Sequence, residues 1–238
     1  MSSVVNLERL ARVAQVLSGL SKPVVYVGGA TIGLYVDAFA ARHARLTDDV
    51  DGLVAVAGNA EFADLESELR ALGLVHCEDE DAPICRWVLD GDILVDVMPT
   101  DERILGFSNR FYPAGFARAE KIALPDGAAV KVMRLEYLLA TKVEAFKGRG
   151  KDDPFGSKDF EDIVAVLDGA DCLAAVTTAD AEVREYLARW FADYLLAWPR
   201  LTEAVSGNLP QPPSSARLAA AMRQIRGIAA LAQCDGEP

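Results

Sequence analysis

The spacing of apolar residues changes near residue 132, and this change limits the fold more than any other feature of the chain. Before it, short apolar segments alternate with turns that carry Gly or Asp, which is the pattern of strands among helices. After it, apolar residues recur every three or four positions, as in amphipathic helices. A mixed half followed by a helical half predicts an α+β protein, with one domain over 1–130 and a helical domain over 131–238.

Individual elements follow from the same spacing. In the first half, apolar residues on one face predict a helix over 4–20. Further helices are expected over 30–41 and, as a charged surface helix that ends at Gly73, over 61–72. Short apolar runs predict strands over four segments: 24–27, 50–56, 84–89 and 92–97. The last two strands form a hairpin that turns at Asp90-Gly91-Asp92, and the segment 99–129 carries little periodicity. In the second half, helices are expected to include 135–146, 160–167 and 183–195, with a last helix after Pro213.

The chain is acidic, with a net charge of −12 over 238 residues. A protein that binds nucleic acid over a broad face uses many Lys and Arg contacts and is usually basic. Any polynucleotide substrate is therefore expected to be held by a local patch or by a metal site. The hydrophobic fraction of 51% is enough for a large core, and no apolar run is long enough to cross a bilayer.

The cysteines and the N-terminus bear on the compartment. Four cysteines are scattered without a close pair: Cys77, Cys85, Cys172 and Cys234. A bridge between the first two is conceivable, but a chain of this size can fold without one, and reduced thiols in the cytoplasm are expected. The first residues carry Glu8, Arg9 and Arg12 among apolar positions, which indicates an amphipathic helix and not a signal peptide.

The segment Arg45-Leu46-Thr47-Asp48-Asp49-Val50-Asp51 bears most directly on chemistry. Alternate side chains of a strand share a face, so Asp49 and Asp51 are expected to point the same way, about 7 Å apart. Paired carboxylates suit a hard divalent cation such as Mg²⁺, which prefers oxygen ligands. A solvated acidic turn is the alternative interpretation, because Asp-x-Asp alone is a common pattern.

Two further features favour a metal site. Gly28-Gly29 follows a strand and precedes a helix, where a phosphate can approach the backbone, although an ordinary strand–helix turn has the same pattern. Asp96 stands in the middle of the apolar strand 93–97, where a charge is costly without a partner. A neighbouring strand that carries Asp49 and Asp51 would supply the partner, through a metal shared by the three carboxylates.

Together, Gly28-Gly29-Ala30-Thr31 and Arg45-x-Thr47-x-Asp49-x-Asp51 resemble the first motif of the AbiEii-type (MenT-like toxin) branch of the DNA polymerase β-like nucleotidyltransferases. Downstream, the segment 135–142 is similar to the family's helix with a lysine, and Lys158-Asp159-x-x-Asp162 is similar to its Lys-Asp-x-x-Asp element. The resemblance spans residues 24–168 in the family's order. It implies a polymerase β-like core, with a mixed sheet and flanking helices, followed by a helical domain that completes the active site.

The resemblance also implies roles for single residues. Asp49, Asp51 and Asp96 would bind two Mg²⁺ ions, and Asp96 would assist deprotonation of an acceptor hydroxyl. Lys142 would bind the triphosphate, and Asp159 would be an active-site acid or would orient Lys142. Further candidates for contacts to the nucleoside triphosphate, ATP or another NTP, are Gly28, Gly29, Thr31, Arg45, Thr47 and Arg110.

Without the resemblance, the downstream residues have simpler interpretations. Lys142 falls on the apolar stripe of its helix, where a lysine either meets an anion or reaches back to the surface. Asp159 follows an expected Ser157 cap, where stabilisation of the helix dipole is sufficient reason for a carboxylate. Arg110, with Tyr112 and Arg118 nearby, suits contacts to phosphate and base, and equally suits loop packing.

The function expected from these features is transfer of a nucleoside monophosphate from an NTP to an acceptor hydroxyl. The resemblance suggests tRNA as the acceptor and a toxin–antitoxin pair as the setting, with a cognate antitoxin as partner. Two alternatives stay open at this point. One is a nucleotidyltransferase for a small molecule of antibiotic type, and the other is a non-catalytic nucleotide-binding module.

Overall fold

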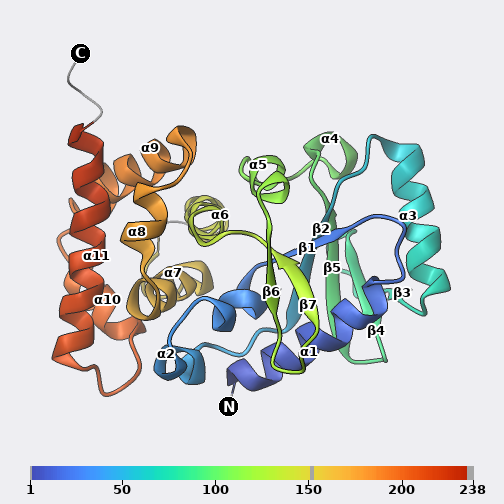
Figure 1. The fold of residues 1–238 in the computed structure, drawn as a ribbon, viewed down its shortest axis with the longest axis horizontal. Helices are drawn as coiled ribbons and strands as arrows, with labels where there is room; N and C mark the ends of the chain where they lie inside the picture. Colours follow the sequence, from blue (N-terminus) through green and yellow to red (C-terminus); the bar gives the residue numbers. More distant parts are fainter. Residues whose placement is uncertain (1, 151–152, 235–238) are drawn as a thin grey trace. The chain divides into compact units, whose positions relative to one another are not determined.

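The computed structural model describes residues 2–150 and 153–234, which form two compact units (Figure 1). The first unit consists of Met1–Leu34 and Arg45–Arg134, and the second consists of Tyr35–Ala44 and Leu135–Pro238. The segment Tyr35–Ala44 therefore belongs to the second unit, although its neighbours in sequence on both sides belong to the first. The domain limits drawn from the sequence, at about residue 130, stay a prediction.

The described part of the first unit is built on a mixed sheet of seven strands in the order β3-β4-β5-β2-β1-β7-β6. The strands are β1 (Val24–Val27), β2 (Asp49–Val54), β3 (Val75–His76), β4 (Arg86–Leu89), β5 (Ile93–Pro99), β6 (Glu120–Ala123) and β7 (Ala129–Val132). The central strand β2 pairs parallel with β5 and antiparallel with β1. This architecture, a mixed sheet with helices and a helical second part, confirms the predicted fold class.

Strand register places the chemically important residues. The parallel pairing of β2 with β5 sets Asp51 opposite Asp96. The antiparallel pairing of β4 with β5 sets Arg86 opposite Asp96 from the other side. Because directly opposed residues share one face of a sheet, the three side chains project to the same side. The predicted hairpin is confirmed: Leu89 pairs with Ile93 across a turn at Asp90-Gly91-Asp92, in which Asp90 and Gly91 have positive φ, at 55° and 88°.

Helices of the first unit cover the sheet and its loops. They are α1 (Ser2–Leu17), the 3₁₀ helix η1 (Gly29–Leu34), α3 (Asn59–Ala71), α4 (Glu102–Leu105) and α5 (Tyr112–Ala117). Helix α1 packs against η1 and β2 and buries Leu10, Val13 and Leu17, as its spacing predicted. The polar residue Asn6 is also buried on this helix, at 3% exposure.

The predicted helix over 30–41 is wrong. The chain forms η1 and then a separate helix, α2 (Ala38–His43), with Asp37 between them in an extended conformation (φ −61°, ψ 162°). Asp37 Oδ1 accepts hydrogen bonds from the backbone N–H groups of Phe39 (2.9 Å) and Ala40 (2.8 Å). An N-cap has non-helical backbone angles by nature, so Asp37 starts a new helix and interrupts the old one.

The segment 99–129, which showed little periodicity, contains α4, α5 and β6, and the strand β7 begins at its end. The two strands pair as an antiparallel hairpin, with Ile122 opposite Val130. Strand β6 lies at the edge of the sheet and exposes most of its side chains, so its residues do not alternate between apolar and polar. An exposed edge strand leaves little hydrophobic pattern for sequence analysis to detect.

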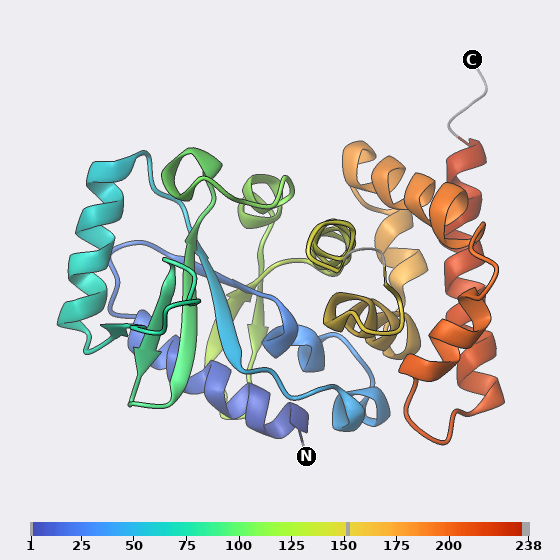
Figure 2. The ribbon, with the colours of Figure 1, turned by 180° about the vertical axis from the view of Figure 1, so that it is seen from behind.

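The second unit is helical in its described residues. In addition to α2 it contains α6 (Leu135–Gly148), α7 (Lys158–Gly169), α8 (Cys172–Thr177), α9 (Ala181–Arg189), the π-helical turn η2 (Trp190–Leu195), α10 (Leu201–Asn208) and α11 (Ser215–Cys234). The long helix α11 packs against α7, α8, α9 and η2 (Figure 2). The core of this unit includes three fully buried aromatic residues, Phe146, Phe160 and Phe191.

The thiols and hydropathy of the described residues bear on two expectations. Cys77, Cys85 and Cys172 are free, so the bridge between the first two that the sequence left open is not formed. The side chain of Cys234 lies outside the part that the structure describes. No helix among the described residues combines the length and the apolar character needed to span a membrane.

We expect Asp37→Ala to lower the free energy of unfolding by about 1 kcal/mol, the usual worth of an N-cap. The variant removes the cap of α2 and also the ion pair between Asp37 and Arg217 Nη2, at 3.0 Å. Urea denaturation followed by circular dichroism measures the change. Asp64→Ala, at an exposed position within α3, is the matched control. Equal stability of the two variants would show that Asp37 does not determine where α2 begins.

Candidate active site

Three carboxylates converge on one face of the first unit's sheet. Asp49 and Asp51 lie on β2 and Asp96 lies on β5, and each offers an oxygen such that the three oxygens lie within 4.8 Å of one another. Asp96 is buried at 6% exposure, whereas Asp49 and Asp51 are half-buried. The sequence singled out these three residues, and the parallel register of β2 and β5 brings them together.

The glycine corner supports this geometry. A Cβ atom on Gly28 would lie 1.9 Å from Asp51 Oδ2, so the carboxylate packs directly on the Gly28 backbone. Gly28 also has a φ of 78°, in the left-handed region that favours glycine. The position of the Asp51 carboxylate therefore depends on the absence of a side chain at residue 28.

The donors suit a hard divalent cation. Carboxylate oxygens are the ligands that Mg²⁺ prefers, and a shared cation relieves the repulsion among three acidic groups. Cys85 precedes Arg86 and is 2% exposed. Burial and then the charge of Asp96 raise the pKa of its thiol to about 12, so the free thiol is protonated at neutral pH. The residues present thus fit Mg²⁺ or a similar oxygen-seeking ion.

Sequence analysis missed Arg86, which joins two of these carboxylates. Its Nε donates to Asp96 Oδ1 (2.8 Å) and its Nη2 donates to Asp96 Oδ2 (2.7 Å). The same Nη2 donates to Asp49 Oδ2 (2.6 Å). The hydrogen bond to Asp96 is the main reason why the pKa of Arg86 is raised, so the guanidinium stays charged. The signal was available, because a hairpin that turns at Gly91 sets residue 86 opposite residue 96.

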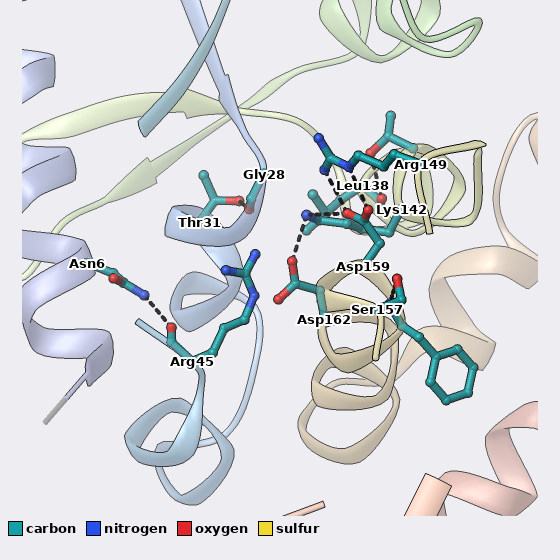
Figure 3. A network of polar contacts seen from close by, with 12 residues as sticks. Asn6, Gly28, Thr31, Arg45, Leu138, Lys142, Arg149, Ser157, Asp159 and Asp162 are labelled. Carbon is teal, nitrogen blue, oxygen red and sulfur yellow. Dashed lines mark hydrogen bonds and ion pairs between the residues drawn. The ribbon is translucent and has the colours of Figure 1, made fainter. Parts of the chain in front are cut away.

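The predicted phosphate-binding turn is tightly packed. A Cβ atom on Gly29 would lie 2.5 Å from Thr47 Cγ2 and 2.7 Å from Arg45 Nη2, so both side chains lie against the Gly29 backbone. Thr31 is fully buried, and its hydroxyl donates to the carbonyl of Gly28 (2.9 Å), as Figure 3 shows. In this structure Thr31 stabilises the turn, and its role in phosphate binding stays a prediction.

Helix α1 holds the segment that leads into β2. Asn6 Nδ2 donates to the carbonyl of Arg45 (2.9 Å), and Asn6 Oδ1 accepts from the backbone N–H of Thr47 (3.1 Å). Arg9 Nη1 donates to the carbonyl of Thr47 (2.7 Å). These contacts were not foreseen, although Asn6 stands four residues before Leu10 on the buried face of its helix. They fix the backbone just before Asp49.

In the second unit, Lys142 is buried between two carboxylates (Figure 3). Its Nζ lies 2.6 Å from Asp162 Oδ2 and 3.3 Å from Asp159 Oδ1. The side chains of Lys142 and Asp162 are 8% and 1% exposed. The sequence left two places open for this lysine, against an anion or at the surface, and here it contacts two acidic side chains of α7. The role of Asp159 in orienting Lys142 for a nucleotide stays a prediction.

Arg149 completes this network from the end of α6. Its Nε and Nη2 donate to the two Asp159 oxygens, at 2.8 and 2.9 Å. Burial of the Asp159 carboxyl would raise its pKa, but the hydrogen bond from Arg149 and the charges of Lys142 and Arg149 outweigh burial and lower the pKa. The expected Ser157 cap is present, because its hydroxyl accepts from the backbone N–H of Phe160 (3.4 Å). Sequence analysis gave Arg149 no role.

Arg110 lies on the surface of the first unit. Its guanidinium carbon lies 4.9 Å from the centre of the Phe111 ring, a stacking contact that packs the loop before α5. Contact between Arg110 and a nucleotide stays a prediction.

Comparison with known proteins finds neighbours of low identity. No family model and no curated protein matches the chain. Among solved structures, the chain is similar to the antibiotic-resistance factor ANT(2'')-Ia, at 19% identity and a TM-score of 0.46, over 82% of this chain and 95% of that one. It is also similar to an antigenic nucleotidyltransferase-like protein from Paracoccidioides brasiliensis, at 16% identity and a TM-score of 0.48, over 87% and 94%. The AbiEii-type pattern in the sequence stays a resemblance.

We expect Gly28→Ala to displace the Asp51 carboxylate and to weaken binding of Mn²⁺, a spectroscopic substitute for Mg²⁺. The added methyl group would overlap Asp51 Oδ2 and would also strain a backbone at positive φ. Gly127→Ala is the matched control, because Gly127 has a φ of 87° and no atom lies within 4 Å of its built Cβ. Calorimetric titration with Mn²⁺ measures the difference. Equal affinity in the two variants would show that the absence of a side chain at Gly28 is not needed for metal binding by the carboxylates.

We expect Lys142→Met to lower the free energy of unfolding by about 3–5 kcal/mol, because it leaves the buried Asp162 carboxylate without its cation. A double variant, Lys142→Met with Asp162→Leu, should recover part of that loss, since it replaces the buried pair by apolar groups of similar size. Urea denaturation measures both. A single variant as stable as the unmodified chain would mean that the pair does not stabilise the helical unit.

Proposed function

We propose that this chain is a metal-dependent nucleotidyltransferase that transfers a nucleoside monophosphate from an NTP to an acceptor hydroxyl. The observation that carries the proposal is the convergence of Asp49, Asp51 and Asp96 within 4.8 Å beside a glycine corner. Three acidic groups on two parallel strands are costly to bring together unless they hold a cation. The order of motifs along the chain, which resembles that of the AbiEii-type enzymes, supports the same reaction class.

The proposed reaction is an in-line substitution at phosphorus. The oxygen of the acceptor hydroxyl forms a bond to the α-phosphorus of the NTP. The bond from that phosphorus to the oxygen that bridges to the β-phosphate breaks, and pyrophosphate leaves. The hydroxyl proton passes to a carboxylate, for which Asp96 is the candidate. Such reactions depend on positioning and on electrostatic stabilisation of the phosphates.

The candidate site residues of the first unit have separate parts in this scheme. Asp49, Asp51 and Asp96 would hold two Mg²⁺ ions. When bound, these ions would neutralise phosphate charge and make the acceptor hydroxyl more acidic. Gly28 keeps Asp51 in place by leaving room for its carboxylate, and the turn that follows brings Arg45 against the backbone of Gly29. A guanidinium at such a turn suits a phosphate group.

Lys142 and Asp159 belong to the second unit, and their predicted roles in triphosphate binding stay predictions. The ion pairs with Asp159 and Asp162 give Lys142 a structural role that does not require a nucleotide. The proposal for catalysis therefore rests on the carboxylates of the first unit.

The acceptor is proposed on weaker grounds. The resemblance favours an RNA end such as that of tRNA, with the chain acting as the toxin of a toxin–antitoxin pair. The net charge of −12 favours an acceptor that does not need a broad basic surface, such as a small cationic molecule of antibiotic type. A protein that only binds nucleotides is the remaining alternative.

We expect Asp51→Asn to lower the rate of nucleotidyl transfer by about 10²–10³-fold or more, the usual cost of losing one electrostatic contact in a transition state. The assay incubates the protein with Mg²⁺ and each α-labelled NTP, together with total RNA or with a panel of aminoglycoside-type amines that bear hydroxyls. Asp64→Asn on α3 changes the same charge at an exposed site and should leave the rate unchanged.

The distribution of label identifies the acceptor. Labelled RNA on a gel supports the RNA acceptor, and a labelled product of low mass supports the small-molecule alternative. If the folded protein labels neither and binds Mg²⁺–NTP in calorimetry, it is a nucleotide-binding module. Normal transfer by Asp51→Asn would contradict the assignment of the carboxylates.

A further inference from the structure

We propose that Arg86 is a built-in counter-cation that occupies the carboxylate cluster when no metal is bound, and that metal binding displaces it. The inference rests on the proposed function, because it concerns the same three carboxylates. It adds a competitor for the metal at the same carboxylates. No sequence motif suggested this residue.

Arg86 contacts oxygens of two of the three carboxylates in the cluster. Both oxygens of Asp96 accept a hydrogen bond from its guanidinium, and Asp49 Oδ2 accepts a third from the same Nη2 that contacts Asp96. The guanidinium therefore links β4 to the two carboxylates as a bridging cation would. A divalent ion bound to both Asp49 and Asp96 would lie next to a fixed positive charge, which opposes its binding.

The chain needs some cation at this place. Asp96 has a side chain that is 9% exposed, and a buried carboxylate without a partner is strongly destabilising. Arg86 supplies the partner through two parallel hydrogen bonds, the geometry in which a guanidinium binds a carboxylate most strongly. Arg86 thus stabilises the buried Asp96 carboxylate, and a bound metal would stabilise it in place of Arg86.

Arg86 also has a route out of the cluster. Its side chain is 22% exposed, more than that of Asp96, so the guanidinium can exchange its carboxylate partners for water without unfolding β4. While it is bound, both oxygens of Asp96 accept hydrogen bonds from its guanidinium. Binding of a metal by Asp96 would therefore require the guanidinium to leave these oxygens.

The test compares Mn²⁺ binding in the unmodified chain, Arg86→Met and Arg86→Lys. Electron paramagnetic resonance of free Mn²⁺ gives the affinity, and circular dichroism confirms folding. We expect Arg86→Met to bind Mn²⁺ at least tenfold more tightly, since the competing charge is gone. Arg86→Lys keeps the charge and loses the two parallel hydrogen bonds, so its affinity should lie between the other two.

Thermal unfolding gives a second readout. Without metal, Arg86→Met should melt at a lower temperature than the unmodified chain, because Asp96 is left buried without a partner. Mn²⁺ should raise the melting temperature of this variant more than that of the unmodified chain. These measurements do not depend on any activity.

A measurement on the unmodified chain covers the case in which Arg86→Met does not fold. The Nε–H resonance of Arg86, assigned by its absence in Arg86→Lys, reports the contact with Asp96. Titration with diamagnetic Mg²⁺ should shift or remove this resonance as the site fills. A resonance that is unchanged at saturating Mg²⁺ would overturn the displacement.

The outcomes separate the inference from the proposed function. Equal or weaker Mn²⁺ binding by Arg86→Met, with clear binding by the unmodified chain, overturns the role of Arg86 and leaves the metal site standing. Absence of binding in both, or binding whose affinity is unchanged on Asp51→Asn, overturns the metal site and the inference with it. Tighter binding by Arg86→Met that is lost on adding Asp51→Asn supports both.

Discussion

The parallel pairing of β2 with β5 is the constraint on which the candidate site depends. It sets Asp51 directly opposite Asp96, and strand alternation adds Asp49 to the same face. Three negative charges at this spacing repel one another, and a cation among them, such as the Arg86 guanidinium, stabilises the arrangement. The flanking features serve this arrangement, because Gly28 makes room for one carboxylate and α1 holds the backbone that precedes the strand.

Both units stabilise their buried carboxylates with a side-chain cation. In the first unit Arg86 bridges Asp49 and Asp96, and in the second unit Lys142 contacts both Asp159 and Asp162. The two cations differ in exposure, at 22% for Arg86 and 8% for Lys142. The more exposed Arg86 is the one that we propose a metal can displace, whereas the deeper Lys142 is suited to fix α6 against α7. Similar chemistry can therefore serve a metal site in one unit and helix packing in the other.

Much of the fold was predictable, and the exceptions have physical causes. Apolar strands and the hairpin around Gly91 follow from local pattern. The meeting of Asp49, Asp51 and Asp96 was expected from the buried charge of Asp96 and from the resemblance, and the register of β2 with β5 produces it. The break between η1 and α2 depends on Asp37, whose partner Arg217 lies 180 residues away in the chain. Arg86 was overlooked because its importance comes from register, which periodicity alone does not reveal. Contacts set by tertiary packing, such as those of Asn6, have only a weak signature in a single sequence.

The path of the chain between the two units has a practical consequence. Strands β1 and β2 of the first unit are separated in sequence by Tyr35–Ala44, which is part of the second. The helix in that segment is anchored by Arg217, and Asp37 N–H donates to the carbonyl of Gly169 (2.7 Å). No single cut of the gene therefore yields either unit whole. A fragment that ends near residue 134 would contain Tyr35–Ala44 without the rest of the second unit. Those ten residues would then form an unpacked stretch in the connection between β1 and β2.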